Sequence, residues 1–106
     1  YRFSTKTKFM DSLSVTNNEF LRQFETKVGN SLACIEYAEQ ERKIFLTKLC
    51  IPDPIQNKEF EEQFISTVLE IIEERNLRVV PTSPKIAGFV RRNKRYKSLL
   101  PVGIKL

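Results

Sequence analysis

Residues 43–81 read KIFLTKLCIPDPIQNKEFEEQFISTVLEIIEERNLRVVP, and this segment predicts a strand, a long helix and a second strand. Lys43–Ile51 is rich in β-branched and aromatic residues and is closed by Pro52, which predicts a strand. Leu77–Val80 predicts a second, brief strand. Between them, apolar residues recur at helical spacing and predict a long helix with one buried face. They are Phe60, Phe64, Val68, Ile71 and Ile72.

The start of this long helix has two candidates. Asp53 would cap a helix that has Pro54 at its first position and Gln56 closing a capping box. Asn57 would cap a start one turn later, and the end is expected near Asn76. The paired glutamates fall on the opposite, polar face, where solvation explains them without a role as general bases. They are Glu61, Glu62, Glu73 and Glu74.

Two shorter segments precede this stretch. Arg22–Val28 and Ser31–Tyr37 predict strands that are separated by the turn pair Gly29-Asn30. The polar run Glu39–Arg42 separates the second of them from the strand that begins at Lys43. Polar turns between consecutive strands indicate an antiparallel meander.

A short helix and a docked tail are expected after the second strand of the crossover. Lys85–Arg92 predicts a short C-terminal helix that packs Ile86, Phe89 and Val90 inward. The apolar residues Tyr96 and 99–100 indicate that the tail docks on the domain. The order β-β-β-α-β-α predicts an α+β domain with a mixed, mostly antiparallel sheet, one long helix and one short C-terminal helix.

Composition excludes several classes of site. The chain of 106 residues is long enough for one domain, has no segment of the ~20 apolar residues that a membrane-spanning helix needs, and is not expected to insert into a membrane. It has no histidine, which excludes catalytic triads and imidazole-based zinc sites. Cys34 and Cys50 are too few for a four-thiolate site, so no metal is expected, and both are predicted to be small buried residues rather than nucleophiles. Glu36 shares a strand face with Cys34, either as an edge position or as a functional carboxylate.

Charge is distributed unevenly along the chain, which has a formal net charge of +5. Residues 53–75 hold seven acids and two bases, whereas residues 85–105 hold seven bases and no acid. This contrast indicates an acidic partner for the C-terminal end, either a protein assembly or RNA, or else bases that simply solvate a helix face and tail. The candidate partner-binding residues are Arg91, Arg92, Lys94 and Arg95.

Residues 1–17 are expected to form an N-terminal extension, with the domain spanning residues 18–106. Tyr1–Thr5 has the Arg- and Ser-containing, acid-poor composition found at the end of an organellar transit peptide. That composition indicates a mitochondrial location, with a cytoplasmic location as the alternative. A tail tied to the sheet edge, or a start at Met10, explains the segment equally well.

Residues 20–100 resemble the smallest members of the GNAT superfamily, the single-domain N-acetyltransferase-like proteins. Three segments carry this resemblance. Leu32–Tyr37 is similar to a family strand that ends in tyrosine, and Phe45–Pro52 is similar to its "leu-x-His-Thr-x-Val-Pro" strand, with Lys48 in place of histidine. The third segment, 77–96, resembles the strand, Cys-Pro or Ser-Pro turn and arginine-rich helix that close the family's domain.

The resemblance implies a coenzyme A site with an altered phosphate loop. Members of the family hold the pyrophosphate with an Arg-Gly-x-Gly loop at a helix N-terminus, where glycines let the backbone approach the anion. The aligned residues here are Gln56, Asn57, Lys58 and Glu59, which include no glycine and bring one negative charge. The resemblance makes Ile51 and Gln56–Lys58 the candidate cofactor-binding residues, and Ser83, where some members carry a cysteine, the candidate catalytic residue.

Two functions follow from this resemblance. The loss of the glycines favours a degenerate acetyltransferase-like domain that uses no cofactor and acts as a binding or structural subunit of a larger assembly. The alternative is an active N-acetyltransferase that moves an acetyl group from acetyl-CoA to an amine. Direct transfer needs little beyond proximity and a proton acceptor, so the absence of histidine does not exclude it.

Overall fold

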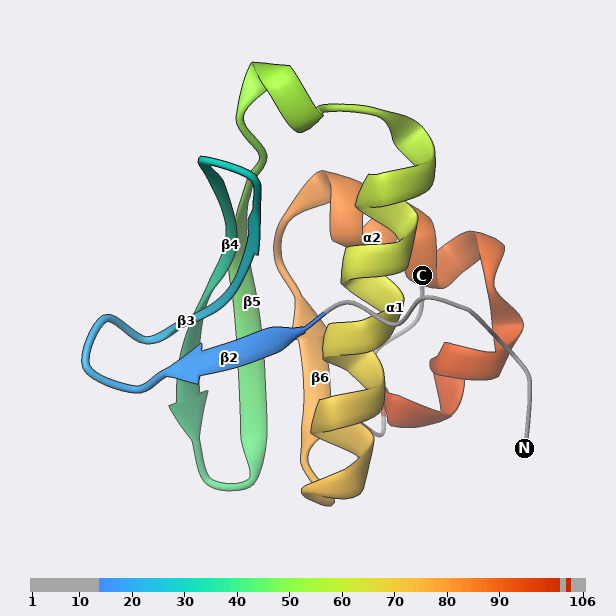
Figure 1. Cartoon of the computed structure of the whole chain (residues 1–106). Helices are drawn as coiled ribbons and strands as arrows, with labels where there is room; N and C mark the ends of the chain where they lie inside the picture. Colours follow the sequence, from blue (N-terminus) through green and yellow to red (C-terminus); the bar gives the residue numbers. More distant parts are fainter. Residues whose placement is uncertain (1–13, 102, 104–106) are drawn as a thin grey trace, which may run out of the picture.

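A five-stranded sheet carries both α-helices on one of its faces (Figure 1). The computed structural model describes residues 14–101 and 103. The strands are β2 (Val15–Asn18), β3 (Gln23–Val28), β4 (Ser31–Gln40), β5 (Lys43–Cys50) and β6 (Arg78–Pro81). The helices are η1 (Asp53–Ile55), α1 (Lys58–Glu74), α2 (Pro84–Arg92) and η2 (Lys94–Leu99). Within the described part of the chain, none of these helices has the length and apolar character needed to cross a bilayer.

The strand order in the sheet is β2-β3-β4-β5-β6, which follows the order in the sequence. The first four strands pair antiparallel with their neighbours, and β5 pairs parallel with β6 through the α1 crossover. The predicted α+β class, with a mixed and mostly antiparallel sheet, is therefore confirmed.

Two-residue turns close both central hairpins. Gly29 has φ 61°, a backbone conformation that glycine adopts without steric cost. Between β4 and β5, Glu41 and Arg42 take φ of 51° and 67°, the left-handed pair typical of a turn that matches strand twist. Strand β4 therefore runs to Gln40, three residues beyond the predicted end at Tyr37, and the turn is shorter than predicted.

Strand β2 was not predicted as a strand, although one alternative for the N-terminal segment was a tail tied to the sheet edge, and β2 is an edge strand. Its residues, VTNN, lie mostly within the segment assigned to an N-terminal extension. Hydrogen bonds hold this edge: the Tyr37 hydroxyl donates to Asn17 Oδ1 at 2.6 Å, and the Thr26 hydroxyl donates to the Ser14 carbonyl at 3.0 Å. Residues 1–13, with the composition that suggested a transit peptide, lie outside the described residues.

The long helix uses the second of the two predicted starts. Asn57 caps α1, and its side-chain oxygen accepts the Phe60 N–H at 2.7 Å. The start at Asp53 is wrong for this helix, because Asp53 and Pro54 lie in the separate 3₁₀ helix η1, whose N-cap is Pro52. The chain leaves α1 through Asn76, whose φ of 59° stops the helix where the sequence predicted.

The core lies between the helices and one face of the sheet. Helix α1 buries a stripe that is rotated slightly from the predicted one, because Ile65 and Leu69 are buried whereas Phe60 and Ile71 are only partly so. The predicted inward residues of α2 are all buried, and Tyr96 of the docked tail is buried as well. The opposite face of the sheet has no helix over it in the described structure (Figure 1).

Candidate functional site

Strands β5 and β6 separate after Leu46. Their parallel register runs from Lys43 opposite Arg78 to Leu46 opposite Pro81, so the rest of β5 extends beyond its partner. Thr82 and Ser83 both donate their backbone N–H to the Leu46 carbonyl at 3.1 Å. The chain after β6 therefore turns toward α2 at the level where β5 continues upward in Figure 1.

A β-bulge lies at the same level. On the β4 side, Tyr37 pairs with Leu46 but Glu36 pairs with Lys48, which leaves Thr47 as the extra residue. The Thr47 hydroxyl donates to the Glu36 carbonyl at 3.2 Å. Because a bulge bends its strand and increases its twist, this residue helps to turn the end of β5 away from β6.

An open groove with a volume of ≈ 400 Å³ lies at the end of β5. Its walls are the continuous segment 49–52 that ends β5, Leu32 of β4, Gln56 before α1, and Lys85 in the first turn of α2. Leu32, Leu49, Ile51 and Pro52 contribute apolar side chains, and Cys50, Gln56 and Lys85 contribute a thiol, an amide and an ammonium group. The groove lies where the resemblance places a cofactor, and it includes two of the predicted residues, Ile51 and Gln56.

The N-terminus of α1 does not fit a pyrophosphate. The Asn57 side chain already accepts one of the free N–H groups, and Glu59 and Glu61 occupy the first turn, where their charges repel an anion. Lys85 is paired with Glu61 at 3.8 Å, which leaves the exposed Lys58 as the positive charge beside this terminus. The Asn57 side chain therefore takes one of the N–H groups that could hold a coenzyme A phosphate, and the two acids of the first turn outnumber Lys58.

Ser83 lies at the N-terminus of α2. Ser83 is only 6% exposed, and its hydroxyl does not cap the helix. The backbone N–H bonds to Leu46, so Ser83 is at the point where β5 and β6 separate. The chain has no histidine to activate the hydroxyl, which is a poor nucleophile without a base.

The two oppositely charged regions of the sequence pack against each other. Three ion pairs join them: Lys85 to Glu61 at 3.8 Å, Arg92 to Glu62 at 3.4 Å, and Arg95 to Glu70 at 3.5 Å. We call these six residues the charged seam. The Tyr96 hydroxyl donates to Glu70 at 3.2 Å, and burial together with the Glu70 charge raises the pKa of Tyr96.

The charged seam divides the predicted partner-binding residues. Arg92 and Arg95 contact glutamates of α1, whereas Arg91 and Lys94 are exposed and appear in no ion pair among the described residues. Much of the charge contrast seen in the sequence is therefore satisfied within the fold. The remaining basic surface is centred on Arg91 and Lys94.

Cys34 and Cys50 face each other across β4 and β5. Both are only half-buried, so the prediction that they are small buried residues holds in part. Burial, and next the Cys50 thiol, raise the pKa of Cys34 to about 11. This thiol is protonated at neutral pH, which fits the expectation that it is no nucleophile.

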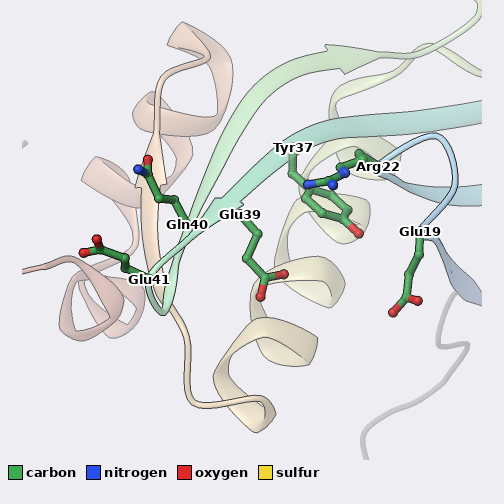
Figure 2. Close-up of a pocket in the computed structure, with 6 residues that line it drawn as sticks. All are labelled: Glu19, Arg22, Tyr37, Glu39, Gln40 and Glu41. Carbon is green, nitrogen blue, oxygen red and sulfur yellow. The ribbon is translucent and has the colours of Figure 1, made fainter.

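A second hollow, of ≈ 350 Å³, lies near the β4–β5 turn (Figure 2). Its polar lining includes Glu19, Arg22 and Glu41, and it also includes Glu39, which is paired with Arg75 at 3.7 Å. Tyr37 forms its wall and donates its backbone N–H to the Arg22 carbonyl at 2.9 Å. The hollow is at the opposite end of the β4–β5 hairpin from the groove, so the two are separate sites.

Sequence reasoning found part of the groove. It placed Ile51 and Gln56 there, but Asn57 and Lys58 are not among the lining residues. It missed Leu32 and Lys85, which come from distant parts of the chain. One signal in the sequence could have identified Lys85 as a groove residue. It follows directly after the Ser83-Pro84 turn, and that turn begins the helix beside the crossover.

Comparison with known proteins agrees with this fold. Residues 23–99 match the family model for GCN5-related N-acetyl-transferases. The chain is similar in structure to a GCN5-like protein from Staphylococcus aureus solved by NMR, with a TM-score of 0.64 and 18% identity over 91% of this chain and 94% of that one. No sequence among the curated proteins matches. Since the family model spans most of its length, the chain belongs to the GCN5-related N-acetyltransferase family.

Proposed function

We propose that this chain is a degenerate member of its family, a domain that does not use coenzyme A and acts as a binding or structural subunit of a larger assembly. The observation that carries this proposal is the N-terminus of α1. There the side chain of Asn57 takes the place of an external anion, and Glu59 adds a negative charge to the position where the family holds a phosphate.

The size of the repulsion between a bound pyrophosphate and the acids of α1 supports this proposal. Two like charges about 4 Å apart repel by about 4 kcal/mol at an effective dielectric of about 20, and by about 1 kcal/mol in water. A pyrophosphate placed at this terminus would meet Glu59 and, less directly, Glu61. Among the described residues beside this terminus, Lys58 offsets part of their charge, and Lys85 is already paired with Glu61.

The basic surface around Arg91 and Lys94 is the proposed contact with the assembly. Both residues are exposed, and Lys97 of η2 is exposed nearby in the sequence. An acidic protein surface would complement this charge and would gain association rate from it. RNA is the other partner class with matching charge, and the experiment separates the two.

The test is sedimentation of the tagged full chain in an extract of its own cells. Wild type should sediment with a large assembly, and the variant Arg91→Glu/Lys94→Glu should sediment as a free domain. The matched control is Lys27→Glu/Lys43→Glu, which changes the net charge equally at exposed positions on β3 and β5. A free wild-type domain, or an Arg91/Lys94 variant that still sediments with the assembly, contradicts the proposal. Loss of the assembly after RNase treatment would assign the contact to RNA.

An active N-acetyltransferase is the second candidate. The groove at the end of β5 favours it, because its walls include Ile51 and Gln56, two of the residues that the family resemblance makes candidates for binding the cofactor. Binding of acetyl-CoA by the wild-type chain discriminates this candidate from the first.

A further inference from the structure

Three donor groups, from Cys34, Glu36 and Cys50, lie close together on the sheet face that has no helix over it. The strand register places Glu25, Cys34 and Cys50 in one row across β3, β4 and β5. Glu36 lies two residues after Cys34 and therefore points to the same face of the sheet. The Cys34 and Cys50 sulfurs and a Glu36 carboxylate oxygen all lie within 4.8 Å of one another.

This spacing suits one small cation. In a tetrahedral zinc site the Zn–S bonds are about 2.3 Å and the Zn–O bonds about 2.0–2.2 Å, so neighbouring ligand atoms are about 3.5–3.8 Å apart. The three groups would need to move by no more than about 1 Å toward a common centre. The two thiols come from rigid neighbouring strands, which fixes their relative positions better than a loop would.

We propose that Cys34, Cys50 and Glu36 form a Zn²⁺ site. Thiolate and carboxylate oxygen are both ordinary zinc ligands, and the half-buried, uncovered position leaves the fourth coordination place to water. Binding forms two Zn–S bonds and one Zn–O bond, and the two thiol protons pass to solvent.

The surroundings of the site contain charges of both signs. Glu25 is the cross-strand neighbour of Cys34 and adds negative charge that attracts a cation. Lys48 is the cross-strand neighbour of Glu36 and balances part of the charge of the loaded site. Two cysteines alone predicted no metal site, and it is the pairing of β4 with β5 that brings in the third ligand. Cys50 also lines the groove at the end of β5, whereas Cys34 and Glu36 are not among its lining residues.

Cobalt(II) titration of the reduced full-length chain tests the site. We expect sulfur-to-metal charge-transfer absorption that saturates at one ion per chain and is displaced by Zn²⁺. Cys34→Ser and Cys50→Ser should each lower this absorption and weaken binding by at least about tenfold, because removal of even an outer-shell partner costs about 10–100-fold. Glu36→Gln should weaken binding comparably while both sulfur contributions remain.

The matched control is Glu39→Gln, which removes a carboxylate from the same strand outside the cluster and should leave affinity unchanged. Circular dichroism of each variant confirms that it folds before titration. Absent charge-transfer absorption in the wild-type chain would overturn the proposal. So would unchanged affinity in either serine variant, or saturation at one ion per two chains.

Discussion

The two α-helices begin at the same end of the molecule but with opposite chemistry. Helix α1 starts at Asn57, whose side chain caps it, and carries acids in its first turn. Helix α2 starts at Ser83, whose hydroxyl caps nothing, and carries Pro84 and Lys85 with no acid. Gln56 and Lys85, one beside each start, line the same groove.

This difference shows that the fold and the anion site are separable. A helix N-terminus binds phosphate only if its N–H groups are open and its field is not cancelled by acids. Helix α1 keeps the position that the family fold gives it, but the Asn57 side chain takes one N–H of its terminus and two acids stand in its first turn. The proposed function therefore keeps the architecture of the family without its anion site.

The largest expected effect comes from removing the core anchor of α1. Phe64 is fully buried and stacks on Phe60 with ring centroids 6.1 Å apart, so Phe64→Ala should lower the free energy of unfolding by about 3–5 kcal/mol. The control Phe20→Ala removes a ring that is 93% exposed and should change stability by no more than about 0.5 kcal/mol. Urea unfolding measures both. A loss below about 1 kcal/mol for Phe64→Ala would contradict the packing of α1.

The N-terminal residues of the two helices should differ in how much they stabilise the fold, which is a smaller effect but a more direct comparison of the two termini. Asn57→Ala removes the bond to the Phe60 N–H and should cost about 1 kcal/mol, within a usual range of about 0.5–2. Ser83→Ala removes no cap bond and should cost clearly less. Equal losses in urea unfolding would mean that the two termini do not differ as described.

The sequence predicted the parts of this fold that depend on local pattern. The helical recurrence of Phe64 and Val68 and the strand composition of Lys43–Ile51 are short-range signals of burial, and the structure confirms both elements. Strand β2 was missed because its VTNN sequence has no apolar pattern. The segment is a strand because it pairs with β3, and its own sequence does not show this pairing.

The candidate sites were harder to predict, because they depend on register and on distant contacts. The bulge at Thr47 follows from how β4 and β5 align. The charged seam needs α2 and η2 to pack beside α1, so the sequence showed the opposite charges but not that Arg92 meets Glu62. Resemblance to a family singled out Ile51 and Gln56, which do line one groove, and their role in binding a cofactor stays a prediction.

The smallest expected effect concerns the charged seam. Arg92→Gln breaks the pair with Glu62, whose charged groups are half-exposed, and should cost about 0.2–1 kcal/mol at low salt. Salt should reduce this cost, because it screens exposed pairs. Arg91→Gln, one residue away on α2, removes the same charge without breaking a described pair and should cost less. The reverse order in urea unfolding would contradict this division of the basic residues.

The proposed loss of the coenzyme site at α1 can be tested directly. Calorimetric titration at low salt should compare the wild-type chain with Asn57→Gly/Glu59→Gly, which reopens the backbone and removes one negative charge. A glycine cap costs only a few tenths of a kcal/mol relative to asparagine, and a glycine in the first helical turn costs about 1 kcal/mol, so the variant should remain folded. We expect no acetyl-CoA binding by wild type at millimolar ligand and measurable binding by the variant. Micromolar binding by the wild-type chain would contradict the account and make the enzyme the better explanation.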